Sequence, residues 1–152
     1  MRSKPPSCVG CACYSHGTDF SAVDGSCQIG VMIVGEASGR EEARDQLPFR
    51  PYAPAGSVLE RALRRMGYSR GQFAVTNILR CRPKNDWLDH SPWEHSAISR
   101  CRTNLVDAIG IYQPRAIWAC GNIAMRELTE FSGVASEKQS VSHLAGYVLR
   151  GR

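Results

Sequence analysis

The chain's seven cysteines carry the first chemical signal. Cys8 and Cys11 form a C-x-x-C pair near the N-terminus, and Cys81 and Cys101 follow far along the chain. Four thiolates that a fold brings together can hold zinc in a tetrahedron, or an iron–sulfur cluster with one thiolate per iron. The spacing does not decide between these groups, and Cys13 offers a substitute ligand.

The remaining cysteines and the composition suggest a cytoplasmic setting. Cys27 and Cys120 adjoin or end expected strands, where a cysteine behaves as a small apolar side chain. An odd cysteine count fits a disulfide framework poorly, and the N-terminus lacks a secretory apolar segment. Because the longest apolar run, residues 29–34, is too short to span a bilayer, we expect no membrane association. We expect a cytoplasmic monomer whose thiols bind a metal or cluster.

A second candidate site is the glycine-bounded turn at residues 35–39, with the sequence GEASG. It follows an apolar run and precedes a charged stretch. Glycine lets the backbone approach a ligand closely, and successive backbone N–H groups can hold a carbonyl or a phosphate. An ordinary tight turn has the same composition, so the segment alone does not establish a binding site.

Apolar runs and one amphipathic segment predict the elements that position these residues. Residues 29–34 have the length and composition of a fully buried strand, and residues 73–79 and 115–120 predict a second and a third strand. Residues 57–66 place their apolar side chains on one helical stripe, and Gly67 supplies a stop. These segments alternate along the chain, which is typical of an α/β protein.

Two further helices are expected in the second half of the chain. Ser91, Pro92 and Glu94 match a capping box with a proline at the first helical position. The helix that they start should end near Ile109, with Cys101 facing inward. A shorter helix is expected over residues 122–131.

These elements predict a three-layer α/β/α sandwich around a short central parallel sheet of about four strands. Ligands of such sheets bind beyond the carboxyl ends of the strands, where residues 35–39 and 76–77 fall. Residues 145–150 have the composition of a fourth strand, and the sequence stops just after them. We therefore expect one domain, residues 1–152, that is incomplete at its C-terminus.

The formal net charge of +5 suits a polyanionic partner. Basic residues form two clusters. One lies on or just after the first expected helix and consists of Arg61, Arg64, Arg65 and Arg70. The other flanks Cys81 and consists of Arg80, Arg82 and Lys84. Such clusters can contact phosphates with an affinity that falls with salt. A solvated helix face has the same composition, so charge alone does not establish this function.

Taken in order, the motifs resemble the iron–sulfur (family 4) uracil-DNA glycosylases over nearly the whole chain. The resemblance rests on the C-x-x-C pair, the turn VGEASG, Pro48-Phe49, PAGSVL, TNILRCRP and the later Cys101. It implies a DNA repair enzyme of base excision that hydrolyses the N-glycosidic bond of uracil in DNA. Each motif alone is modest, but their order and spacing make the combination specific.

The resemblance also implies roles for individual residues. Glu36 would activate water or stabilise a cationic sugar, with Gly35 and Ala37 beside it. Phe49 would stack on an extruded uracil, and Asn77 would bind the Watson–Crick edge of that base. A 4Fe–4S cluster, with zinc as the less favoured alternative, would be bound by Cys8, Cys11, Cys81 and Cys101. The DNA backbone would be contacted by Arg80, Arg82 and Lys84.

Three departures from the family pattern matter. Ser38 stands where the family has a proline. The stretch after Phe49 is about two residues longer than in the family, so Tyr52 is a second candidate for stacking on the base and for limiting access to the pocket. The late His-Pro-Ser/Ala motif is absent, and His143 does not lie where that histidine is expected. The alternative is therefore a weak or inactive nucleic-acid-binding iron–sulfur protein of the same fold. An electron carrier would explain neither the pocket motifs nor the basic helix.

Overall fold

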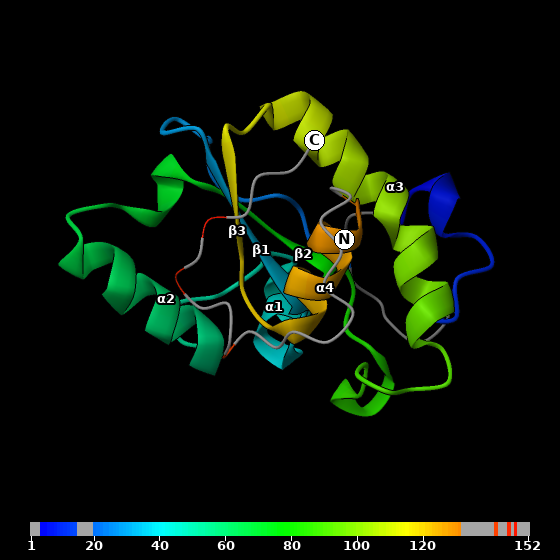
Figure 1. Ribbon diagram of the computed structural model, residues 1–152. Coiled ribbons are helices and arrows are strands. Elements are labelled where there is room, and N and C mark those ends of the chain that lie inside the picture. Colours follow the sequence, from blue (N-terminus) through cyan, green and yellow to red (C-terminus); the bar gives the residue numbers. More distant parts are fainter. Residues whose placement is uncertain (1–3, 15–19, 132–141, 143–145, 147, 149–152) are drawn as a thin grey trace.

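A three-stranded parallel sheet forms the centre of the computed structural model, which describes residues 4–14, 20–131, 142, 146 and 148 (Figure 1). β1 (Val31–Ala37) lies in the middle, β2 (Ala74–Leu79) pairs with one edge of it and β3 (Ala116–Ala119) with the other. Both pairings are parallel. The predicted α/β class is confirmed, as are the strands predicted over residues 29–34, 73–79 and 115–120, with boundaries shifted by up to three residues.

Helices cover both faces of the sheet, so the protein has three layers. α2 (Pro54–Arg65) packs on one face, where Leu59 and Leu63 contact Ile33 of β1. α3 (Glu94–Tyr112) and α4 (Asn122–Phe131) cover the other face, which includes Met32 and Val34. Successive residues of a strand point to opposite faces, which is why one apolar run supplies both cores. The described residues also form four short helical segments: η1 (Pro6–Cys8), α1 (Arg40–Asp45), η2 (Arg70–Gln72) and η3 (Lys84–Asp86).

The start of α3 differs from the prediction. The capping position is Trp93 rather than Ser91, and no side chain caps the helix there. The Glu94 carboxylate instead accepts a hydrogen bond from the His90 backbone N–H at 2.5 Å. The Ser91 hydroxyl is buried and has no hydrogen-bond partner among the described residues. The predicted capping box is therefore wrong, because the chain turns once more before it becomes helical.

The end of α3 also differs from the prediction. The helix continues through Gly110 to Tyr112, and Gln113 ends it with a left-handed φ of 43°. A single exposed glycine costs a helix only about 1 kcal/mol, which neighbouring packing offsets. Pro114 cannot continue the helix, and it therefore sets the end.

β3 forms an edge of the sheet within the described part of the chain, and its Ile117 and Trp118 are 38% and 40% exposed. The fourth strand predicted over residues 145–150 lies outside the described residues, apart from Gly146 and Val148. None of the helices seen in the described ranges has the length and apolar composition needed to cross a membrane.

Candidate functional site

The four predicted ligand cysteines lie around one cavity. Cys8, Cys11, Cys81 and Cys101 line it together with Lys4, Tyr14, Phe20, Leu79 and Arg100. Three separate parts of the chain supply the thiols: the N-terminal segment, the residues just after β2, and α3. The sequence-based grouping of these four cysteines is thus matched by their positions.

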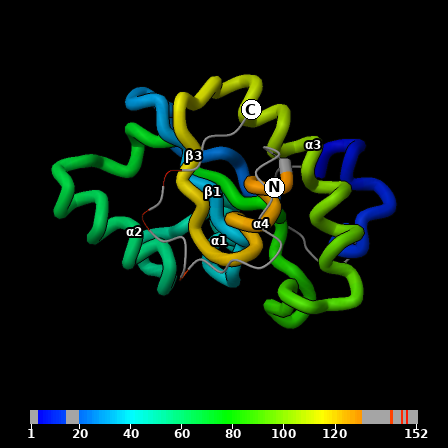
Figure 2. Tube along the Cα trace, in the orientation of Figure 1, coloured from blue at the N-terminus to red at the C-terminus, as the bar shows by residue number. Residues whose placement is uncertain are grey.

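The N-terminal segment that carries Cys8 and Cys11 packs against α3 (Figure 2). The Arg100 guanidinium donates to the Val9 carbonyl at 2.9 Å, and the Ser7 hydroxyl donates to Asn104 Oδ1 at 3.3 Å. Lys4 Nζ donates to the carbonyls of Cys13 and Tyr14 at 2.9 and 2.7 Å. The Arg100 and Asn104 contacts hold this largely irregular segment against the helix that carries Cys101, and the Lys4 contacts join the two ends of the segment.

Asn104 is a polar side chain at the thiol site that the sequence reasoning missed. It is buried on α3, one turn after Cys101, and its Nδ2 donates to the Cys101 Sγ at 3.7 Å. The Cys8 thiol also has Asn104 as a hydrogen-bond partner. The sequence did contain a signal for this residue, because it is an asparagine among the apolar residues on the inward face of a predicted helix. An amide N–H suits a sulfur that carries negative charge.

Burial dominates the protonation of three of these thiols. It raises the pKa of Cys8, Cys11 and Cys101, and the positive charge of Lys4 opposes this for Cys8 and Cys11. The pKa of Cys81 is raised first by a hydrogen bond with Cys13 and then by burial. Thiolates at this site therefore need a nearby cationic group, which a bound metal centre would supply.

The other three cysteines have different surroundings. Cys13 is 1% exposed and its thiol hydrogen-bonds that of Cys81, so it lies within reach of the thiol site. Cys27 is buried and its thiol donates to the Val31 carbonyl at 3.7 Å. Cys120 packs against the core under α2, and burial raises its pKa to about 11. The expected apolar role fits Cys27 and Cys120.

A second site forms where β1 and β2 end. Gly35 and Asn77 are register partners on these adjacent strands, and Asn77 is only 3% exposed. A β-carbon built on Gly35 would lie 2.5 Å from Asn77 Oδ1 and 2.5 Å from the Phe49 ring. The structure therefore brings together three predicted site residues from two strands and a loop.

Glu36 and Ala37 finish β1 beside this site. Both are half-buried. Burial raises the pKa of Glu36, and the nearby carboxylates of Asp89 and Glu94 raise it further, while Arg126 lowers it. Arg126 is itself ion-paired with Glu94. The carboxyl group of Glu36 is consequently easier to protonate than an ordinary glutamate.

Ser38, which replaces the family's proline, is buried directly after this strand. Its hydroxyl hydrogen-bonds the hydroxyl of Ser21 at 2.6 Å. The backbone N–H of Gly39 donates to the Glu42 carboxylate at 3.1 Å, which fixes the start of α1. The turn thus keeps a defined shape through side-chain hydrogen bonds in place of a proline ring.

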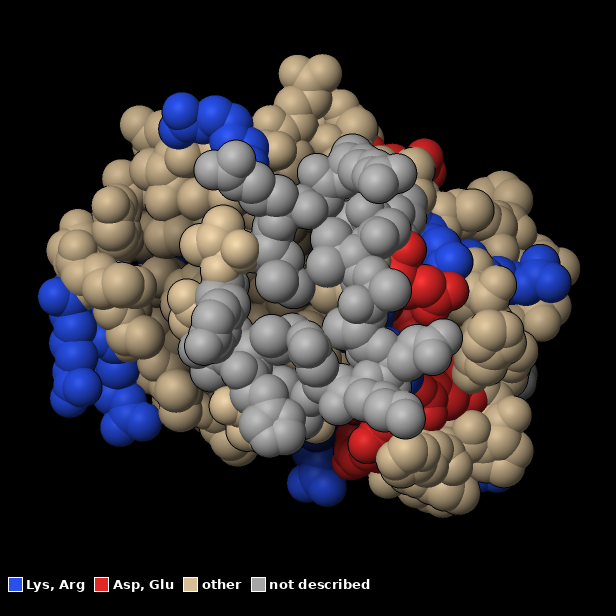
Figure 3. All heavy atoms as spheres, viewed as in Figure 1, with Lys and Arg blue, Asp and Glu red and all other residues tan. Residues whose placement is uncertain are grey.

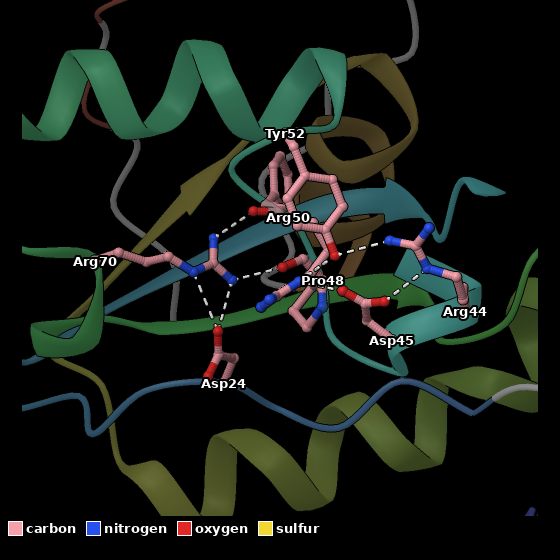
Figure 4. A network of polar contacts seen from close by, with 8 residues as sticks. Asp24, Arg44, Asp45, Pro48, Arg50, Tyr52 and Arg70 are labelled. Atoms are coloured by element: carbon pink, nitrogen blue, oxygen red, sulfur yellow. Dashed lines mark hydrogen bonds and ion pairs between the residues drawn. The ribbon is translucent and has the colours of Figure 1, made fainter. Parts of the chain in front are cut away.

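Tyr52 lies at the surface with 53% of its area exposed. Its hydroxyl accepts hydrogen bonds from Arg44 at 3.2 Å and Arg50 at 3.3 Å, and both guanidinium groups lie 5.5 Å from its ring centre (Figure 4). Asp45 pairs with both arginines. The longer loop therefore builds an exposed aromatic and cationic cluster ahead of α2.

The three residues predicted to bind DNA differ in their surroundings. Arg80 donates to the Ser21 carbonyl at 2.7 Å, and its guanidinium lies 4.4 Å from the Phe20 ring centre. Arg82 pairs with Asp86 at 2.5 Å. Lys84 is exposed at the start of η3. Arg80 thus packs part of the fold, and Lys84 is the most open of the three.

Other charged residues form separate regions on the surface. The exposed arginines of α2 gather on one side of the face drawn in Figure 3, and acidic side chains gather on the other side. On this face the arginines of α2 are therefore separated from the acidic side chains. Such a separation favours one orientation of a polyanion on the protein.

Ligands of open α/β sheets bind beyond the carboxyl ends of the strands, which is where this amide, aromatic ring and carboxyl group lie. Residues 23–149 match the Uracil DNA glycosylase superfamily. The chain belongs to this superfamily, which confirms the resemblance seen in its motifs.

Three curated relatives carry the name Type-4 uracil-DNA glycosylase. The protein from Pyrobaculum aerophilum is 34% identical over 145 residues, which is 95% of this chain and 70% of that protein. Those from Archaeoglobus fulgidus and Sulfurisphaera tokodaii are 30% and 28% identical over 93% and 92% of this chain. The chain spans 60% to 70% of the length of these relatives, with 67% for the Archaeoglobus protein.

The close approach at Gly35 leads to a stability prediction. Gly35→Ala should lower the free energy of unfolding by about 1–3 kcal/mol, because the new methyl group overlaps Asn77 and Phe49. Gly110→Ala is the matched control, since nothing lies within 4 Å of its added β-carbon and alanine favours a helix. Denaturant unfolding followed by circular dichroism measures both. Equal stability of the two variants would contradict the packing described for Gly35.

Proposed function

We propose that this chain is a DNA repair glycosylase that hydrolyses the N-glycosidic bond between uracil and deoxyribose, leaving an abasic site. The observation that carries the proposal is the convergence of Gly35, Phe49 and Asn77 at the strand ends. This arrangement offers a flat apolar surface beside a buried amide. Such a site fits a flipped pyrimidine better than a sugar or a phosphate.

Asn77 is the residue that we assign to recognition of the base. Its amide can donate one hydrogen bond and accept another, which matches the carbonyl and N–H on the Watson–Crick edge of uracil. Its burial removes competing water, so an unpaired amide there would be costly. Phe49 lies against the same space and would stack on the ring. Tyr52, on the longer loop, is the second aromatic candidate for contact with the extruded nucleotide.

Glu36 is the carboxyl group that we assign to the chemical step. As a carboxylate it can hold and activate a water molecule, or stabilise positive charge that develops on the sugar. Gly35 and Ala37 flank it and present backbone to the substrate. Both roles require the deprotonated form, so the raised pKa of Glu36 sets a lower pH limit on activity.

A 4Fe–4S cluster is the group that we assign to Cys8, Cys11, Cys81 and Cys101. The four cysteines line one cavity, which supports one centre shared by all of them, and zinc is the alternative occupant. The Asn104 amide fits this assignment, since hydrogen bonds to the ligand sulfurs are usual around such clusters. The cluster would supply positive charge and cross-link the N-terminal segment to α3 and the end of β2.

DNA containing uracil is the partner that this function requires. Lys84 and the exposed arginines of α2 are the basic groups best placed for phosphate contacts, and Arg82 joins them if it exchanges Asp86 for a phosphate. Arg80 instead packs on Phe20 and donates to the Ser21 carbonyl.

The alternative function is DNA binding without base excision. None of the four histidines precedes a proline, so the family's late His-Pro motif is missing from this sequence. A histidine there would stabilise negative charge on the departing base, an effect that can be worth several kcal/mol. A protein of this type would bind uracil-containing DNA and leave the glycosidic bond intact.

Asn77→Ala tests the proposed recognition. Removal of the buried amide should lower the rate of uracil excision by about 100-fold or more, the scale seen when one positioned hydrogen-bond donor is lost. The assay is alkaline cleavage of a uracil-containing oligonucleotide after incubation. Gln28→Ala removes an exposed amide ahead of β1, at the far end of the sheet, and should leave the rate unchanged. Undiminished excision by the Asn77 variant would refute this assignment, and an inactive wild-type protein would favour the alternative function.

Glu36→Gln tests the proposed chemistry through its pH dependence. The wild-type rate should rise with pH through the raised pKa of Glu36, because only the carboxylate is active and the protonated form persists above the ordinary glutamate range. The glutamine variant should be slow and should lose this rise. Glu130→Gln, at an exposed position on α4, should retain the wild-type profile. A Glu36 variant that keeps the rising profile would assign the titration to another group.

Cys101→Ser tests the proposed cluster. The wild-type protein should show broad absorbance near ~400 nm, as expected for thiolate-bound iron–sulfur centres, and this variant should lose it together with bound iron. Cys101 is chosen because Cys13 contacts Cys81 and could replace it. Cys120→Ser should keep both signals, since Cys120 packs against the other core. A colourless wild-type protein that carries zinc would exclude the cluster.

A further inference from the structure

We propose that Arg70 is a positioning residue that holds Phe49 in place against Asn77, through a buried clamp that also includes Asp24. The inference rests on the proposed function, in which Phe49 stacks on the base. The sequence alone groups Arg70 with the arginines of α2 as a possible phosphate contact. The structure assigns it a different role, because its guanidinium points into the protein (Figure 4).

The first half of the clamp is the contact between Arg70 and the loop that carries Phe49. Arg70 donates from Nη1 to the Phe49 carbonyl at 2.9 Å and from Nη2 to the Pro48 carbonyl at 2.6 Å. Only 13% of the Arg70 side chain is exposed. Two successive carbonyls of one loop are thus bound by one planar group, which fixes the direction of the backbone at Phe49.

The second half of the clamp connects Arg70 to β2. Asp24 Oδ2 accepts hydrogen bonds from Arg70 Nε at 3.1 Å and Nη2 at 2.9 Å. The backbone of Asp24 exchanges two hydrogen bonds with Val75 of β2, at 3.0 and 2.8 Å. Val75 lies two residues before Asn77, so the clamp relates the position of Phe49 to the strand that carries the amide.

Phe49 needs such a restraint because its backbone is in an unfavourable conformation. Its φ of +46° lies in the left-handed region, which a large aromatic residue adopts rarely and only where its surroundings enforce it. Gly56 of α2 packs against the same loop: an added β-carbon there would lie 2.0 Å from the Arg50 carbonyl and 2.5 Å from that of Phe49. Arg70 and Gly56 therefore hold the Phe49–Arg50 backbone between them.

An arginine is the side chain that this clamp requires. Its rigid fork makes four hydrogen bonds to three different residues at once, and the partly exposed Asp24 carboxylate balances its charge. A lysine has a single ammonium group and cannot reproduce this pattern. A phosphate contact would compete with these internal bonds, which is why the positioning role is favoured.

The experiment is a double-mutant cycle on uracil excision with Arg70→Met, Phe49→Ala and both changes together. We expect Arg70→Met to lower kcat/KM by about 10- to 100-fold, the effect of small misplacements in an active site. Because Arg70 acts through Phe49, the double variant should be no slower than Phe49→Ala alone. Arg102→Met is the matched control. Arg102 also pairs with an acidic residue, Glu127 at 3.0 Å, but this pair joins α3 to α4. The kcat/KM of the Arg102→Met variant should equal that of the wild type.

Losses that multiply in the double variant would overturn the inference, as would an Arg70 variant with wild-type kcat/KM. If Arg70→Met does not fold, Arg70→Lys replaces it in the same cycle, with the same expected non-additivity. If the wild type binds uracil-containing DNA without excising uracil, the excision proposal fails and the cycle is measured on the affinity for that oligonucleotide instead. A wild type with neither activity nor preference for uracil overturns both proposals.

Discussion

The parallel register between β1 and β2 is the constraint on which both candidate sites depend. It places Gly35 beside Asn77 at the same end of the sheet, and it lets the chain leave β2 toward Cys81. Since side chains alternate between faces, a shift of one residue would turn Asn77 away from Gly35 and exchange the two cores. The apolar residues of β1 oppose such a shift, because Met32 and Val34 belong to one core and Ile33 to the other.

Much of this arrangement could be predicted from the sequence. The three apolar runs are short and bounded, and β2 is buried along its whole length and β1 along its centre, so their strands and parallel order follow from composition and alternation. The four cysteines and the pocket motifs could be grouped because their order matched a known family. The boundaries of α3 were less predictable: whether Ser91 caps a helix depends on how the preceding loop packs, which local sequence does not encode.

The partners of individual charged side chains could not be predicted in this way. Arg70 and the arginines of α2 are close in sequence and have the same chemistry, yet Arg64 is 76% exposed and Arg70 is 13% exposed. The difference arises from Asp24 and Pro48, which are distant in sequence and reach Arg70 only in the folded chain. Asn104 is similar, because its contacts with Ser7 and Cys8 come from the N-terminal segment, which is distant in sequence. Such tertiary contacts decide whether a polar or charged side chain binds groups inside the protein or faces the solvent.

The thiol site and the base pocket are joined by a continuous set of contacts. Asn77 and Cys81 lie four residues apart on β2 and its extension, and Arg80 between them exchanges hydrogen bonds with Ser21 at 2.6 and 2.7 Å. Ser21 in turn bonds Ser38, which follows Glu36 and Ala37 at the end of β1. A centre that holds Cys81 in place therefore also supports the strand with the recognition amide and the turn beside the carboxyl group. A metal centre at these thiols, as proposed above, would therefore keep the two strand ends in register without taking part in the proposed chemistry.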